Sequence, residues 1–498
     1  MALGVALWAS AAHAQTPPTP PSPDDEDLEV PASPTTEASP TTTVPAPAPE
    51  QPPAASSEPN AAAAAATPPV VSPAPAQVAP PPGSAAAEAP PAPAPGEDGP
   101  VNLERKAHTR PIPTGLKLGG YVQAQFQHNQ LSEDQLLQSG DPLNQNEFVV
   151  RRARLRLDRG WDFAAATLEL DANTVRGATV GIRRAEGSLF YRGKNPAELP
   201  PLVMLSAGIL DIPFGFELAD SARTRWFTER SLGSSALFPT EMDAGAKISG
   251  AVSFLRYAVA ITNGEPVDRH GLPRDPNAAK DVTGRFGAEV GVGRAVELSG
   301  GTSFTFGKGF HAGKQATKST ISWNDINQDG TLQTSELQGT PGSAAEPSEN
   351  FERWAIGLDV QASLRTALGQ SRLYAEAFVA SNHDRGFVPS DPVATSMDAR
   401  QAGGYIALTQ DITEYGVVGF RASIYDPNSD VIETRAAKVL PKEQTVKTFS
   451  PLVGLTLPGR ARLLFQYDFV RDYLARDEVG VPTDADNDQW TLRLQVEL

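Results

Sequence analysis

Apolar and polar residues alternate, position by position, through many short segments between residue 112 and the carboxyl terminus. Successive side chains of a β-strand point to opposite faces, so each segment predicts a strand with one apolar and one polar face. The first segment runs from Leu116 to Gln127, and the last from Trp490 to Leu498. Gly, Pro, Asn and Asp clusters separate the segments, as is typical of antiparallel sheets. Comparable alternation recurs in Thr167–Asn173, Ile182–Arg192, Tyr257–Thr262, Leu298–Phe306, Trp354–Val360, Leu373–Val379, Val417–Tyr425 and Arg462–Val470.

The alternation alone does not decide whether the apolar faces point inward, as in a soluble sandwich, or outward into lipid. Many polar positions carry long charged or amide side chains. Tyr191, Phe469, Tyr473 and Trp490 lie near segment ends, where membrane barrels place aromatic girdles. We therefore predict an all-β fold, a transmembrane antiparallel β-barrel over residues 111–498. At ~10 residues per tilted strand, this length accommodates about 16 strands, or up to 18, around a water-filled lumen.

Composition sets two further segments apart from the barrel. Residues 1–14 end in Ala12-His13-Ala14, the small-x-small pattern that precedes a cleavage site, and predict an export signal that lacks a basic start. Residues 15–110 are rich in Pro, Ala, Ser and Thr, with no Lys or Arg before Arg105. They predict a disordered, semi-stiff linker in the periplasm, with an unselected spacer as an equal alternative. The predicted location is therefore the outer membrane of a bacterium.

The formal net charge of -17 is concentrated in the linker. Eleven of the 59 acidic residues lie before residue 100, so 48 acids remain against 42 Lys and Arg. This balance argues against a nucleic-acid partner, which would need a clustered basic face. The chain has no cysteine, which excludes disulfides and thiolate metal sites. No catalytic motif occurs, so we do not predict an enzyme.

The segment from Glu147 to Asp158 concentrates basic residues on one predicted strand. Regular alternation stacks Arg152, Arg154 and Arg156 in a row on the lumen face and leaves Arg151 near the membrane interface. The lipid face of this strand would then carry Val149, Ala153, Leu155 and Leu157.

Three guanidinium groups in a row repel one another unless acids or anions counter them. Glu169 and Asp171 lie on the polar face of the next predicted strand, and Arg184 lies on the strand after it. The sequence leaves open a wall held by ion pairs and a path for anions, and the two are compatible. Arginine suits both because its planar fork binds carboxylate or phosphate bidentately. We predict that all six residues line the pore.

Several ordered segments resemble the phosphate-selective porin O/P family, over roughly residues 112–498. They are Gly120-Tyr-Val-Gln-Ala-Gln125, Arg151-Arg-Ala-Arg-Leu-Arg156-Leu, Leu168-Glu-Leu-Asp171, Gly208-Ile-Leu-Asp-Ile-Pro-Phe-Gly-Phe-Glu217, Thr228-Glu-Arg-Ser231 and Thr262-Asn-Gly-Glu265. The resemblance implies a trimeric, sixteen-stranded outer-membrane channel in which anions pass along a ladder of arginines. Arg152, Arg154 and Arg156 are the positions that carry over. The lysines of the family are not visible here, and Leu498 stands where a terminal aromatic residue is usual.

The segment from Asp211 to Ala244 is long and carries Pro213, Gly215 and three arginines between two predicted strands. It can fold inward as a constricting loop or lie outside the lumen, and the sequence favours neither.

A second pattern is specific for a cation. Asp325-x-Asn327-x-Asp329-Gly330-Thr331-x-Gln333-x-x-Glu336 matches the calcium loop of EF-hands at every fixed position. We predict calcium ligation by side chains of Asp325, Asn327, Asp329, Gln333 and Glu336 and by the carbonyl of Thr331. The alternative is an acidic, solvated turn.

Two functions follow from these features. The first is a passive porin for small anions, phosphate among them, or polar solutes, with lumen arginines that set selectivity. The second is a barrel-anchored structural or adhesion protein with a calcium-binding surface loop. Expected partners are outer-membrane lipid, small anions or polar solutes, two further copies in a homotrimer, and peptidoglycan through the linker.

Overall fold

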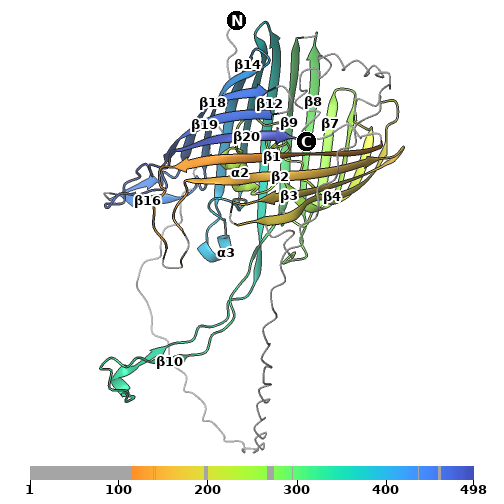
Figure 1. Ribbon diagram of the computed structural model, residues 1–498. Helices are drawn as coiled ribbons and strands as arrows, with labels where there is room; N and C mark the ends of the chain where they lie inside the picture. Colours follow the sequence, from red (N-terminus) through yellow and green to blue (C-terminus); the bar gives the residue numbers. More distant parts are fainter. Residues whose placement is uncertain are drawn as a thin grey trace, which may run out of the picture. The chain divides into compact units, whose positions relative to one another are not determined.

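The computed structural model describes residues 115–498, except 138–139, 141, 176, 196–199, 266–273, 294, 436 and 458–460. The predicted export signal (1–14) and linker (15–110) lie outside the described residues. Sixteen strands close into one antiparallel barrel, which confirms the predicted fold class (Figure 1). The barrel strands are β1 (Gly115–Asn129), β2 (Glu147–Gly160), β3 (Ala164–Asn173), β4 (Thr179–Tyr191), β5 (Val203–Asp211), β6 (Met242–Val252), β7 (Leu255–Thr262), β8 (Asp281–Val292), β9 (Val296–His311), β12 (Glu349–Thr366), β13 (Gly369–Ser381), β14 (Arg400–Ile412), β15 (Gly416–Asp426), β18 (Val446–Leu457), β19 (Ala461–Asp472) and β20 (Gln489–Glu497).

Each barrel strand pairs with its neighbours in chain order, and β20 pairs with β1 to complete the circle. Tight turns such as 253–254, 367–368 and 413–415 join strands at one end, and long connections such as 212–241 and 312–348 join them at the other. The start of β1 and the end of β20 lie at the tight-turn end, where the Leu498 amide donates to the Gly120 carbonyl at 3.0 Å.

The two faces of the wall differ in polarity as the alternation predicts. On β1, Leu116 and Leu118 are exposed outside, whereas Gln123 and Gln125 are buried inside. The last strand, β20, repeats the pattern, with exposed Leu492, Leu494 and Val496 between the buried residues Thr491, Arg493 and Gln495. On these two strands the inner face is therefore polar and the outer face apolar.

The prediction for β2 is wrong at two positions. Val149 is 4% exposed and lies opposite the inward residue Gln125, whereas Phe148 is 85% exposed on the outside. Arg151 contacts Glu229 inside the lumen rather than lying at the interface. The cause is a β-bulge, because Gln123 pairs with Arg152 and Ala124 with Val150, which leaves Arg151 unpaired in the ladder. An extra residue shifts the parity of every position before it.

The smaller elements lie in the connections between barrel strands. They are α2 (Leu232–Leu237), which lies inside the barrel, α3 (Pro392–Thr395), the hairpin of β16 (Ile432–Arg435) and β17 (Lys438–Pro441), and an arm over residues 312–348 (Figure 1). The arm carries β10 (Thr320–Trp323), the turn η1 (Thr334–Glu336) and β11 (Leu337–Thr340). Among the described residues, no helix has the length and apolar run needed to cross a membrane.

Candidate functional site

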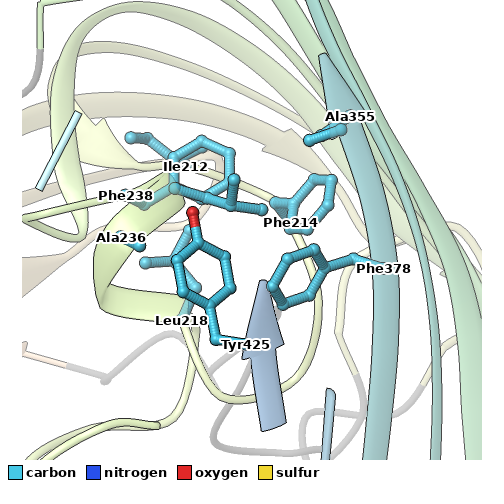
Figure 2. Packing of buried hydrophobic residues seen from close by; sticks show 10 residues of the cluster. Ile212, Phe214, Leu218, Ala236, Phe238, Ala355, Phe378 and Tyr425 are labelled. Atoms are coloured by element: carbon cyan, nitrogen blue, oxygen red, sulfur yellow. The ribbon is translucent and has the colours of Figure 1, made fainter. Parts of the chain in front are cut away.

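Residues 212–241, between β5 and β6, fold into the lumen and form what we call the inward loop. Ile212, Phe214, Leu218 and Phe238 of this loop are 2–3% exposed and pack as one apolar cluster. Figure 2 shows this cluster against Ala355, Phe378 and Tyr425, which come from β12, β13 and β15. Of the two placements that the sequence left open for residues 211–244, the structure has the one inside the barrel.

Polar contacts fix the start of the inward loop to the wall. The amides of Phe216 and Glu217 donate to Oε2 of Glu376 at 3.2 and 3.0 Å, and the Gly215 amide donates to Oγ of Ser303 at 2.9 Å. Gly215 has a φ of +59°, and a Cβ there would lie 1.8 Å from Oε1 of Glu376. Only glycine allows this backbone to approach the β13 carboxylate so closely.

The predicted arginine row lies on the inner face of β2, where each arginine has an acidic partner. Nη2 of Arg152 contacts Glu229 at 2.8 Å, and Nε of Arg154 contacts Asp171 at 3.1 Å. Arg156 contacts Asp158 at 2.7 Å and Glu169 at 3.2 Å. We call this row of Arg152, Arg154 and Arg156 the arginine wall. It is held by ion pairs, which is the first of the two compatible arrangements that the sequence allows.

The remaining predicted pore residues lie on the neighbouring strands β3 and β4. Glu169 is 6% exposed and faces Arg154, Arg156 and Arg183. Arg184 is 4% exposed and contacts Glu186 at 3.4 Å and also Asp211. The structure thus brings all six predicted pore-lining residues to one side of the lumen.

Sequence reasoning missed Arg183, which a second bulge turns into the lumen. Glu169 pairs with Arg184 and Leu170 pairs with Ile182, so the ladder skips Arg183. Nη1 of Arg183 contacts Glu169 at 2.6 Å, and its Nη2 contacts Glu241 of the inward loop at 3.1 Å. Regular alternation would have placed this arginine outside. The available signal was the doublet Arg183-Arg184, since strict alternation would leave one charge of such a pair facing lipid.

Glu229 of the inward loop is the acidic centre of this site. Its carboxylate contacts Arg151 at 2.9 Å, Arg152 at 2.8 Å and Arg493 of β20 at 2.7 Å. Burial alone would raise the pKa of the Glu229 carboxyl, but the three guanidinium groups hold that pKa well below its usual value. Glu229 therefore stays ionised and holds the loop against the arginine wall.

Two cavities lie between the inward loop and the arginine wall, and Arg154 borders both. The larger, of about 420 Å³, is lined by five cationic side chains and three acidic ones: Arg151, Arg152, Arg154, Arg183 and Arg230 against Asp171, Glu229 and Glu241. The smaller, of about 310 Å³, is lined by four cationic side chains and two acidic ones: Lys117, Arg154, Arg156 and Arg223 against Asp158 and Glu169. Cationic groups outnumber acidic ones in both linings.

The predicted calcium loop lies in the arm. Asp329 accepts hydrogen bonds from Asn327 Nδ2 at 2.9 Å, Gln333 Nε2 at 2.8 Å and the Thr331 amide at 2.7 Å, while Asp325 accepts from the Gly330 amide at 2.8 Å. Trp323 Nε1 instead donates to Oε2 of Glu336 at 2.9 Å. Within the described ranges, no group of three or more His, Asp or Glu side chains is arranged for a metal ion.

No protein-family model matches this chain, and no curated protein is detectably similar in sequence. One similar solved structure is a loop-deletion mutant of OmpT, an outer membrane protein of Vibrio cholerae, with 8% identity, a TM-score of 0.45, and coverage of 77% of this chain and 99% of that chain. The outer membrane channel DcaP of Acinetobacter baumannii has 9% identity, a TM-score of 0.45, and coverage of 77% and 97%. An anion-selective porin from Comamonas acidovorans has 10% identity, a TM-score of 0.43, and coverage of 77% and 98%. A similar strand arrangement at such identities does not imply a shared solute.

Proposed function

We propose that this protein is an outer-membrane porin, a passive channel for small anions, phosphate among them, or polar solutes. The observation that carries the proposal is the cationic excess in both cavities between the inward loop and the arginine wall. The apolar exterior suits lipid, and a closed barrel leaves no strand edge unpaired in the membrane. Arg152, Arg154, Arg156 and Arg184 set selectivity, while Glu169 and Asp171 hold these arginines in place.

The proposal also includes how the protein is oriented in the outer membrane and how its copies assemble. Membrane barrels of this kind place tight turns in the periplasm and long loops outside the cell. Residue 115 lies at the tight-turn end, so a linker that precedes it would enter from the periplasm, within reach of peptidoglycan. The resemblance of the sequence to the phosphate-selective porin O/P family supports assembly as a homotrimer.

Single-channel recording in planar bilayers tests the channel and its sign together. We expect an open conductance whose reversal potential in a potassium chloride gradient indicates anion preference, and replacement of chloride by phosphate tests that anion. The combined substitution Arg152→Ala, Arg154→Ala and Arg156→Ala should lower the anion preference. The matched control is Arg400→Ala with Arg471→Ala, two exposed arginines outside the lumen.

Absence of any conductance from correctly assembled barrels would contradict the channel. Unchanged anion preference in the triple variant would remove those arginines from the mechanism. Absence of anion preference in the wild type would leave a non-selective pore.

We propose a second function, calcium binding by Asp325, Asn327, Asp329, Thr331, Gln333 and Glu336, which would stiffen the arm for a structural or adhesive role. The observation that favours it is the backbone of the loop, since Gly330 has a φ of +68° at the position where calcium loops turn sharply. Calcium would have to draw Glu336 away from Trp323. Calcium-dependent cell contact, lost in a variant with Glu336→Gln, would support this role, and calcium-independent contact would contradict it.

A further inference from the structure

A third cavity lies on the other side of the inward loop from the arginine wall. It has a volume of about 70 Å³ and is bounded by the inward loop and by the inner faces of β13, β14, β15 and β19. On the scale where one water needs roughly 10–15 Å³ of such space, the cavity has room for about five non-hydrogen atoms. Its walls share no residue with the two cavities beside Arg154.

Four arginines line this cavity, and three of them have acidic partners. Arg372 contacts Asp411 at 2.7 Å, Arg421 contacts Glu217 at 3.1 Å, and Arg462 contacts Glu497 at 3.4 Å. The fourth, Arg225 of the inward loop, is 7% exposed. Its Nε, Nη1 and Nη2 are all buried, and they have no hydrogen-bond partner among the described residues.

A buried guanidinium with no acceptor is costly, because the group loses its hydration and gains nothing in return. Such groups are exceptional in folded proteins and call for a specific explanation, of which a bound ion is one. Glu217 does not serve Arg225, since its two oxygens accept from the Ser231 amide and hydroxyl and from Arg421. The cavity therefore presents one strong cationic donor that the described protein groups do not use.

The other walls of the cavity are mostly aromatic, apart from Asp220 and Thr224, whose hydroxyl donates to the Asp220 carboxylate at 3.1 Å. Phe216 stacks on Tyr374 with ring centroids 5.4 Å apart, and Tyr405 and Ala407 complete this side. The Trp226 ring lies under the guanidinium of Arg462, with 5.1 Å between its centroid and Cζ. These aromatic rings suit a hydrocarbon body, and the other three arginines of the lining already have acidic partners.

We propose that this cavity binds a small monocarboxylate, with the carboxylate on the fork of Arg225 and the hydrocarbon part against Phe216, Tyr374 and Trp226. The planar guanidinium matches a carboxylate bidentately, and the binding neutralises its charge. The ligand sits between the loop and the wall, so its binding stabilises the inward loop in place. This site is separate from the proposed anion path and does not depend on it.

Calorimetric titration of the detergent-solubilised full chain with sodium propionate tests the site. We expect one propionate per chain and no binding of propionamide, which has nearly the same shape without the charge. Arg225→Gln should weaken propionate binding at least tenfold, and Arg225→Lys should weaken it less because the charge remains. The control Arg365→Gln changes an exposed arginine at the end of β12 and should leave binding unchanged.

The outcomes separate the alternatives. Equal binding of propionate by wild type and Arg225→Gln, or equal binding of propionamide, would overturn the site. Chloride or phosphate that displaces propionate at equal concentration would overturn the carboxylate assignment and leave a general anion site. If Arg225→Gln fails to assemble, an increase in wild-type thermal stability with propionate but not propionamide supports the proposal, and equal stability with both contradicts it. None of these measurements needs an open channel, so the porin proposal can fail independently.

Discussion

Two glutamates of the inward loop, Glu217 and Glu229, each neutralise arginines that come from the barrel wall. Glu217 is 4% exposed, and its carboxylate joins Arg421 of β15 to the Ser231 amide and hydroxyl. Glu229 joins Arg151, Arg152 and Arg493 from the other side of the lumen. The loop is therefore anchored at both sides by charge, in addition to its apolar cluster. Neither acid belonged to the predicted site, because which loop side chains reach a wall depends on the path of the loop.

Glu217→Gln tests the anchoring directly. The change leaves a buried guanidinium without its ionic partner, and we expect a loss of about 3–5 kcal/mol in the free energy of unfolding. Protease cleavage within residues 212–241 and denaturant unfolding in detergent measure the effect. The control Glu352→Gln removes a pair in which Glu352 is 78% and Lys308 47% exposed. That pair should contribute roughly 0–1 kcal/mol, and equal losses in the two variants would contradict the role of Glu217.

At the scale of strands, alternation correctly predicted which residues of β1 and β20 point out of the barrel, but it failed where the ladder slips. Bulges at Arg151 in β2 and at Arg183 in β4 each turn a second arginine into the lumen. A pattern of period two predicts faces only while the pairing stays regular, because a single extra residue reverses the parity. The arginine doublets marked both positions, since lipid does not accept an unpaired guanidinium at a strand face.

Deletion of Arg151 should be tolerated. The remaining chain pairs Arg152 with Gln123 and Val150 with Ala124, as it already does, so the barrel keeps its register. Deletion of Ala377 from β13, whose ladders with β12 and β14 are regular and contain no bulge to absorb the change, reverses the parity of the residues on one side of it and should prevent assembly. Heat-modifiable migration on gels distinguishes folded from unfolded barrels for both variants.

The substitution Arg151→Ala separates charge from geometry. It keeps the bulge and removes one contact of Glu229, so it should assemble and show the same change in ion selectivity as the deletion. Normal assembly after deletion of Ala377 would contradict the parity argument.

The arm of residues 312–348 provides a second test at this scale. The hydrogen bond from Trp323 lowers the pKa of the Glu336 carboxyl below its usual value of 4.5. A carboxyl with a lowered pKa keeps its charge, and hence this contact, until the pH falls below the ordinary range. Trp323 fluorescence, taken as the difference between wild type and Trp323→Phe, should therefore change with a midpoint below pH 4.5.

Calcium added at neutral pH should change the same signal if it draws Glu336 out of contact with Trp323, and chelation should reverse the change. The variant Glu336→Gln should not respond to calcium. A wild-type signal that is indifferent to calcium would favour the solvated turn.

For the whole molecule, the number of strands and their closure were predictable because lipid imposes one rule on every strand. The filling of the lumen was not predictable in this way. Phe214, Leu218 and Phe238 are apolar residues that suit either a lipid face or an interior cluster, and only the three-dimensional path of the loop decides between them. The predicted porin function and calcium site stay predictions.

Lysine substitutions on the outer face of β12 test whether this exterior faces lipid. Leu358 lies near the middle of the strand and is 63% exposed, whereas Leu364 lies near the tight turn and is 45% exposed. We expect Leu358→Lys to cost about 2–4 kcal/mol of stability in a bilayer and Leu364→Lys about 0–1 kcal/mol. Reversible denaturation from lipid vesicles measures both variants. Equal, small costs would mean that water covers this face.

The pairing of β1 with β20 makes the wall a ring that only its final strand can seal. Until Gln489–Glu497 docks, two rows of amides and carbonyls, one on β1 and one on β19, have no partner, and lipid offers none. Assembly of the barrel is therefore most vulnerable at its last step, the pairing of β20 with β1 and β19. Damage to the final nine residues of this strand would leave an open sheet rather than a slightly weakened barrel.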